Sequence, residues 1–97
     1  MKVQNQFGKA FRQVRRARGL TQESFAVESG RTYVSELERG VKHPTLNKID
    51  ELAAPLGIHP LTVLALSYAT KADLVEFEKL WLQVRREIEE ILANSHG

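Results

Sequence analysis

The sequence predicts an all-α fold, with five helices in residues 1–69 and one long amphipathic helix after them. Three observations predict this. Apolar residues recur three and four positions apart through most of the chain, which is the spacing of one helical face. Short segments that contain Gly or Pro separate these periodic stretches. Residues 74–93 contain neither Gly nor Pro, so we expect a single uninterrupted helix there.

The composition is that of one small domain that does without cysteine chemistry. Its 97 residues are enough to bury a modest core. The absence of cysteine excludes disulfides, zinc fingers and thiol catalysis. Because the sequence shows neither a secretory signal nor an apolar run of membrane length, we expect a cytoplasmic location and no membrane partner.

Charge is divided unevenly along the chain. Residues 1–45 hold nine Lys/Arg and four Glu, which gives a net charge of +5. Residues 46–97 hold five Lys/Arg and eight Asp/Glu, which gives −3. A basic front half beside an acidic back half predicts a polyanionic partner for the front half only.

The first helix is expected over residues 7–17, where basic residues surround an apolar face. That face consists of Phe7, Ala10, Phe11, Val14 and Ala17. Gly19 is expected to end the helix as its C-cap. Arg15 lies one turn before this cap and is expected to reach inward to Glu38, which would lock the first helix to the third. For the other basic residues, Lys9 among them, a solvated surface and a polyanion contact both remain open.

Two short helices joined by a tight turn are expected between residues 21 and 39. Thr21 is a candidate N-cap for the first of them, which runs from Gln22 to about residue 28. Gly30 supplies the backbone freedom that the reversal needs. The second helix turns outward a polar row made of Arg31, Thr32, Ser35, Glu36 and Arg39. Such a pair suits a reader of the major groove, because one helix can brace on the DNA backbone while the other enters.

Two further helices are expected before the tail. One begins after Thr45 as its N-cap and runs to about Leu56, with Pro55 expected to kink or fray its last turn. Its expected inner face is Leu46, Ile49, Leu52, Ala53 and Leu56. The next helix begins at Pro60 and runs to about residue 69. It is apolar on two sides, so something beyond the five helices has to cover it.

Residues 70–97 are expected to form a separate segment for dimerisation. Thr70 to Asp73 have the pattern of a capping box, and the helix that follows should continue to residue 93 or 94. Its apolar residues follow the 3-4 spacing of a heptad seam: Leu74, Phe77, Trp81, Val84, Ile88 and Ile91. Two roles are open for this apolar seam, folding back onto its own domain or pairing between molecules, and pairing is the preferred interpretation. The two roles can coexist if the first turns pack on the fifth helix and the rest of the seam meets a second copy.

Several short motifs occur in one order and at tight spacings between residues 6 and 68. They are Phe11-Arg12, Gly19-Leu20-Thr21-Gln22-Glu23, Tyr33-Val34-Ser35, Leu37-Glu38-Arg39-Gly40 and Pro44-Thr45-Leu46. This part of the chain resembles the Cro/repressor-type (Xre-like) helix-turn-helix regulators. The resemblance implies a compact, lambda-repressor-like DNA-binding domain in residues 1–69, which binds operator DNA as a dimer. The tail from Thr70 onward lies outside the resemblance.

The resemblance also implies roles for single residues. Gln22 should anchor a phosphate or a base edge, and Arg15 with Glu38 matches the buried ion pair of the family. The implied base contacts are Arg31, Thr32, Ser35 and Glu36, with Tyr33 at the groove edge, and the implied DNA-backbone contacts are Arg39, Lys42 and His43. The turn before Tyr33 is about two residues shorter than is usual in the family, so Gly30 is expected to be the N-cap of the recognition helix.

Glu36 carries the most information about the kind of binding. An anion that faces a polyanion is unfavourable unless it accepts a hydrogen bond from cytosine N4 or adenine N6, or restrains a neighbouring arginine. Its presence therefore favours discrimination between bases over plain phosphate binding.

Two functions remain open from the sequence. The first is a sequence-specific transcriptional regulator, most simply a repressor, which binds an inverted repeat of double-stranded DNA as a homodimer. The second is an interaction module, such as an antitoxin, whose C-terminal seam binds a different protein. The sequence offers no nucleophile–base pair, metal-ligand set or Gly-rich phosphate loop, so no enzymatic activity, metal or cofactor is expected.

Overall fold

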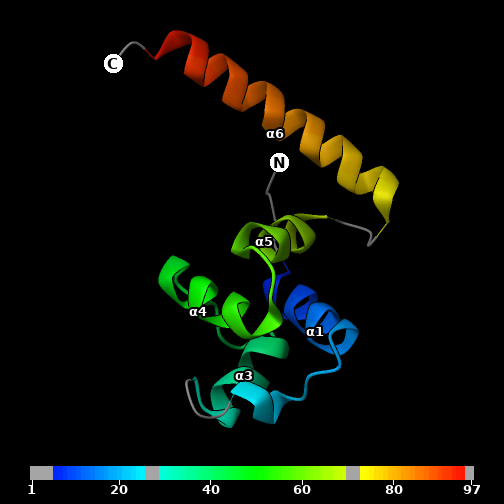
Figure 1. Cartoon of the computed structure of the whole chain (residues 1–97), viewed down its shortest axis with the longest axis vertical. Helices are drawn as coiled ribbons and strands as arrows, with labels where there is room; N and C mark the ends of the chain where they lie inside the picture. Colours follow the sequence, from blue (N-terminus) through cyan, green and yellow to red (C-terminus); the bar gives the residue numbers. More distant parts are fainter. Residues whose placement is uncertain (1–5, 26–28, 70–72, 96–97) are drawn as a thin grey trace.

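The computed structural model describes residues 6–25, 29–69 and 73–95, and within them every element is helical. The elements are α1 (Phe7–Ala17), the 3-10 helix η1 (Gln22–Phe25), α3 (Arg31–Glu38), α4 (Leu46–Leu56), α5 (Pro60–Tyr68) and α6 (Leu74–Asn94). Figure 1 shows the elements up to α5 gathered into one body, with α6 extending above it. The predicted all-α fold is confirmed.

The core of the body lies where α1, η1, α3, α4 and α5 face one another. Its buried members are Phe7, Ala10, Phe11, Val14, Phe25, Val34, Leu37, Ile49, Leu52, Leu56 and Val63. The Phe11 side chain is fully buried and meets the ring of Phe25 edge-on, with the ring centroids 5.1 Å apart. These residues come mostly from the predicted three-and-four periodicity, so hydrophobic burial along those faces is what holds the body together.

Two residues predicted on inner faces are exposed, and those predictions are wrong. Ala17 ends α1, where the chain turns away, and Leu20 beyond it packs against the core instead. Leu46 begins α4 and is 75% exposed, while Ile49, one turn later, is buried. Both residues lie at a helix end, Ala17 at the last position of α1 and Leu46 at the first position of α4.

The end of α1 is fixed by the glycine that the sequence singled out. Gly19 has a φ of 71°, which L side chains rarely adopt. Its N–H donates to the carbonyl of Arg16, and the Leu20 N–H donates to the carbonyl of Arg15, both at 3.0 Å. This pair of bonds is a Schellman motif, and it directs the chain from α1 towards η1.

The predicted second helix differs in its first turn. Gln22–Phe25 is 3-10 helical, and residues 26–28 lie outside the described residues. The cap also differs from the prediction, because the Ser24 hydroxyl accepts from the Thr21 N–H at 3.2 Å. The tighter i to i+3 geometry of the 3-10 turn places Ser24 over Thr21, so Ser24 reaches back instead of Thr21 reaching forward.

The two helices α4 and α5 form a bent pair. Thr45 caps α4 as predicted, since its hydroxyl accepts from the Lys48 N–H at 3.2 Å, and Pro55 lies in the last turn. His59 caps α5, with Nδ1 accepting from the Leu61 N–H at 3.0 Å. Among the described residues, no single helix is long and apolar enough to cross a membrane. The pair α4 and α5 reaches those limits only when counted together, across a bend of 109°.

The last helix leaves most of its surface uncovered. Asp73 is its N-cap, with the carboxylate accepting from the Glu76 N–H at 2.9 Å; Thr70 to residue 72, where the cap was predicted to begin, lie outside the described residues. The 21 residues of α6 make a rod of about 32 Å. None of them is buried, and α6 meets the body through α5. The apolar seam is therefore not buried by its own domain within the described residues.

Candidate nucleic-acid interface

The helix α3, which is expected to be the recognition helix, is anchored on one side and open on the other. Val34 and Leu37 are buried in the core and fix its inner side. Gly30 is the N-cap, with φ 83° and ψ 138°, which confirms the expectation drawn from the shortened turn. The polar residues of α3 lie on the side of the helix away from Val34 and Leu37, so they remain at the surface.

The residues predicted to contact bases lie along this open side. Arg31 and Thr32 are exposed in the first turn, and Ser35 and Glu36 are half-buried in the second. Arg31 reaches across to Glu23, with Nη1 and Oε1 3.1 Å apart, in an ion pair that is exposed on both sides. Within the described part of the chain Glu36 makes no ion pair with Arg31 or Arg39, so its carboxylate is free to accept a hydrogen bond from outside.

Tyr33, which is expected at the groove edge, also contacts α4. It is half-buried against the core, and the Lys48 ammonium of α4 lies 5.1 Å from its ring centroid. Burial raises the pKa of the Tyr33 phenol, which the nearby Lys48 charge partly opposes. Tyr33 therefore also joins α3 to α4.

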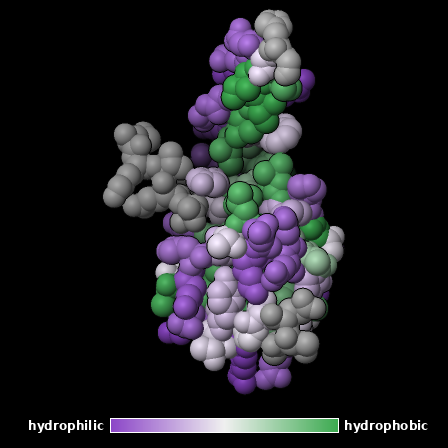
Figure 2. Space-filling model, turned by 90° about the vertical axis from the view of Figure 1, so that its left-hand side faces the viewer, coloured by the Kyte–Doolittle hydropathy of each residue, from purple (hydrophilic) through white to green (hydrophobic). Residues whose placement is uncertain are grey.

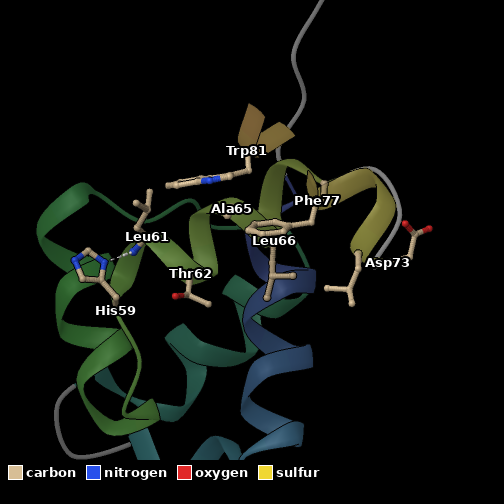
Figure 3. Close-up of a pocket in the computed structure, with 10 residues that line it drawn as sticks. His59, Leu61, Thr62, Ala65, Leu66, Asp73, Phe77 and Trp81 are labelled. Carbon is tan, nitrogen blue, oxygen red and sulfur yellow. Dashed lines mark hydrogen bonds between the residues drawn. The ribbon is translucent and has the colours of Figure 1, made fainter. Parts of the chain in front are cut away.

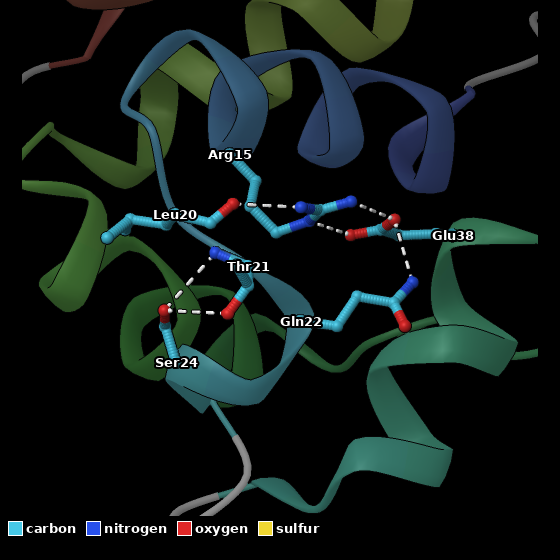
Figure 4. Close-up of polar contacts among 6 residues, drawn as sticks. All are labelled: Arg15, Leu20, Thr21, Gln22, Ser24 and Glu38. Carbon is cyan, nitrogen blue, oxygen red and sulfur yellow. Dashed lines mark hydrogen bonds and ion pairs between the residues drawn. The ribbon is translucent and has the colours of Figure 1, made fainter.

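A nearly buried ion pair joins α1 to the end of α3 (Figure 4). Arg15 Nε lies 2.6 Å from Glu38 Oε2, and Arg15 Nη2 lies 2.9 Å from Glu38 Oε1. The two side chains are only 10% and 3% exposed. The third arginine nitrogen, Nη1, donates to the Leu20 carbonyl at 2.9 Å, and the hydrogen bonds to Glu38 raise the pKa of Arg15. The expected pair is thus present in bidentate geometry.

Gln22 is oriented by the same carboxylate. Its Nε2 donates to Glu38 Oε1 at 3.1 Å, so one amide hydrogen is engaged. The other amide hydrogen and the carbonyl oxygen remain for a phosphate or a base edge. The sequence pattern did not reveal this contact, because the two residues meet only through the packing of η1 on α3.

A second set of polar residues follows the end of α3. Arg39 is exposed and donates from Nε to the Ser35 carbonyl at 3.3 Å, while Lys42 and His43 are exposed in the next loop. Arg39, His43 and Lys9 are among the residues that line a hollow of about 310 Å³ at the start of α1. The structure thus brings Lys9, whose role the sequence left open, next to residues predicted to contact the DNA backbone.

The first turn of α1 also lines this hollow, together with Glu38, whose carboxylate is paired with Arg15. Gln6 is the N-cap of α1 and makes no side-chain capping bond, and no acidic residue lies in the first turn. The free N–H groups of that turn carry partial positive charge. The described residues contain no group of three His, Cys, Asp or Glu side chains that would hold a metal ion.

A short helix packed on the body, and a second helix that begins after Gly30 and keeps one polar side open, define a helix-turn-helix protein. The chain belongs to the helix-turn-helix family, whose model matches residues 11–63. This is a family of DNA-binding regulators and not of enzymes, and the chain is a DNA-binding transcriptional regulator. The matched region ends within α5, so α6 lies outside it.

Comparison with known proteins gives the same result. The HTH-type transcriptional regulator y4dJ of Sinorhizobium fredii is 42% identical over 60 residues, which are 60% of this chain and 78% of that protein. Control protein C.BamHI of Bacillus amyloliquefaciens is 36% identical over 61 residues, 60% of this chain and 75% of that protein. The crystal structure of the restriction-modification controller protein C.AhdI from Aeromonas hydrophila is 42% identical, with a TM-score of 0.55, over 60% of this chain and 91% of that one.

Proposed function

We propose that this regulator binds an inverted-repeat operator as a homodimer and represses transcription by occupying it. The observation that carries the proposal is the open polar side of α3, held in place by the buried Arg15–Glu38 pair on its other side. A rigid helix with exposed hydrogen-bonding groups is what direct readout in the major groove requires. Two relatives named as controllers support a regulatory role over an architectural one.

The side chains divide into base-reading and positioning groups. Thr32, Ser35 and Glu36 read base edges, and Arg31 does so after releasing its exposed partner Glu23. Positioning on phosphates falls to Gln22, Arg39, Lys42, His43 and Lys9. Phosphate contacts fix the register of the protein on the duplex, whereas base contacts give the specificity.

Dimerisation falls to residues 70–97, outside the DNA-binding domain of residues 1–69. Four members of the apolar seam are exposed: Leu74 at 78%, Trp81 at 44%, Ile88 at 47% and Ile91 at 63%. A continuous apolar stripe of this length is unfavourable in water and is typical of an interaction surface. A second copy covers it with an identical heptad pattern, and two domains then read the two halves of a repeat.

Glu36→Ala is expected to relax the preference at one base pair of each half-site while leaving the fold intact. Loss of an acceptor for cytosine N4 or adenine N6 should reduce discrimination at that position by about 1–3 kcal/mol. Binding to a set of operators with single base changes measures this. Asp50→Ala, on an exposed residue of α4, is the control and should change nothing. Equal weakening of Glu36→Ala on every sequence would contradict base reading by this residue.

Arg39→Ala is expected to weaken binding to all sequences alike and to flatten its salt dependence. Loss of one phosphate contact should lower the log–log slope by about one for each half-site. The measurement is a titration of DNA affinity against salt concentration. Arg86→Ala removes the same charge from an exposed position of α6 and should leave the slope unchanged. If Arg39→Ala also leaves it unchanged, Arg39 does not contact the DNA backbone.

A further inference from the structure

An apolar groove lies between α5 and the first half of α6 (Figure 3). Its volume is about 470 Å³. The apolar side chains along it are Leu61, Ala65 and Leu66 from α5 and Leu74, Phe77 and Trp81 from α6. Leu61 is 52% exposed, so the wall on the α5 side also lacks a cover. The sequence predicted that α5 is apolar on two sides and needs a cover beyond the five helices, and Leu61 lies on the side that is still open.

The second half of α6 protrudes, and among the described elements only α5 packs closely on α6, beside its first half. Here the apolar seam continues through Val84, Ile88 and Ile91, and Leu92 beside it is 67% exposed. Figure 2 shows apolar residues continuing from the body along the projecting helix. One half of α6 thus forms a groove with its own body, and the other half is a free apolar ridge.

We propose that two copies pair with their α6 helices antiparallel, so that the free half of each α6 fills the groove of the other copy. This inference rests on the homodimer proposed above and specifies its geometry. The register follows from the heptad: Leu74 lies opposite Ile91 of the second copy, Phe77 opposite Ile88, and Trp81 opposite Val84. Since the axis is two-fold, both grooves are filled by the same contacts.

The position of the body favours this direction. The helix α5 lies beside the first half of α6. In a parallel pair, the first halves of the two α6 helices would meet, so the α5 of the second copy would come to the groove and not its free α6 half. Among the described elements, none packs on the free half, so that half is open to enter the groove of the second copy. Parallel pairing would also place Ile88 against Ile88 and Ile91 against Ile91 of the second copy. No apolar residue of the second half of α6 would then reach the groove, so Leu61 and Ala65 would stay uncovered.

The charges beside the apolar seam favour the same direction. Glu78 follows Phe77 and Arg85 follows Val84, so the antiparallel register sets Glu78 of each copy against Arg85 of the other. Parallel pairing would instead set Asp73 against Glu78. Arg85 at present pairs with Glu89 at 3.0 Å in an exposed ion pair, which constrains it little.

Single cysteines distinguish the two directions, because the chain has none of its own. Leu74→Cys and Ile91→Cys are made separately, and each is oxidised alone and in a mixture. A disulfide needs Cα atoms within about 7 Å of each other. Antiparallel pairing predicts that the mixture gives a covalent dimer joined 74 to 91, identified by mass spectrometry, while each variant alone gives little.

The other outcomes are equally decisive. Covalent dimers of Leu74→Cys alone and of Ile91→Cys alone, without a mixed product, would overturn the antiparallel inference and keep the homodimer. A monomer of the unaltered chain in sedimentation equilibrium would overturn the homodimer itself, most directly if a different protein then fills the seam.

Charge reversal tests the same register without cysteines. Glu78→Arg and Arg85→Glu are each expected to weaken the dimer roughly fivefold in sedimentation equilibrium, since each places like charges together twice. The double variant restores opposite charges and should recover the original affinity. Failure of the double variant to recover, with helical content unchanged by circular dichroism, would overturn the pairing of Glu78 with Arg85.

Discussion

Glu38→Ala is expected to lower the free energy of unfolding by about 3–5 kcal/mol, because it leaves a buried charge without its partner. The Arg15 side chain is only 10% exposed and directs two nitrogens at the Glu38 carboxylate. Gln22 would lose the acceptor of its amide at the same time. Urea denaturation followed by circular dichroism measures the loss.

A surface ion pair provides the matched control for this prediction. Lys48 Nζ lies 3.1 Å from Glu51 Oε2, and the Glu51 side chain is 53% exposed. Glu51→Ala should therefore change stability by less than about 1 kcal/mol, because water and salt screen such a pair. A similar loss in the two variants would show that the burial of Arg15 and Glu38 is not what makes their contact important.

Gly8→Ala is expected to destabilise the protein by at least about 2 kcal/mol, although Ala is the better helix former by about 1 kcal/mol. A Cβ added at Gly8 would lie 2.0 Å from the carbonyl oxygen of Leu37 and 3.2 Å from the Cα of Glu38. Both atoms belong to the backbone of α3, so no side chain can rotate away. The helices α1 and α3 would have to separate, which disturbs the core and the ion pair together.

Gln13→Ala is the control for this change, because Gln13 is exposed on the same helix. Thermal and urea unfolding of the two variants should show a loss for Gly8→Ala only. If Gly8→Ala were as stable as the unaltered protein, the close crossing of α1 and α3 would be contradicted. The position of the recognition helix would then be in question as well.

The helix faces were the part of the fold that the sequence predicted best. Three-and-four spacing placed Phe11, Val14, Ile49 and Leu52 in the core, because the period fixes the direction of a side chain from its helix axis. It failed at Ala17 and Leu46. Direction alone does not say whether a neighbouring element extends as far as a helix end, so the last apolar position of a face is the least certain.

For the candidate site, the sequence predicted which residues share one side of α3, but not the contacts that those residues make with other helices. Periodicity places Ser35 and Glu36 on the open side of α3, since their neighbours Val34 and Leu37 are buried. Periodicity could not predict the contacts between different helices. The bond from Gln22 to Glu38 and the approach of Lys9 to the end of α3 depend on how helices cross, which no spacing within one helix records.

In the proposed dimer, the α3 helices of the two copies read base edges in two adjacent major grooves. Selection of binding sequences from a random pool of duplex DNA, followed by methylation interference, tests this readout most directly. We expect an inverted repeat with half-site centres about one helical turn apart, and interference at guanine N7, in the major groove. Recovery of DNA without a shared sequence, or a site unaffected by major-groove methylation, would contradict it.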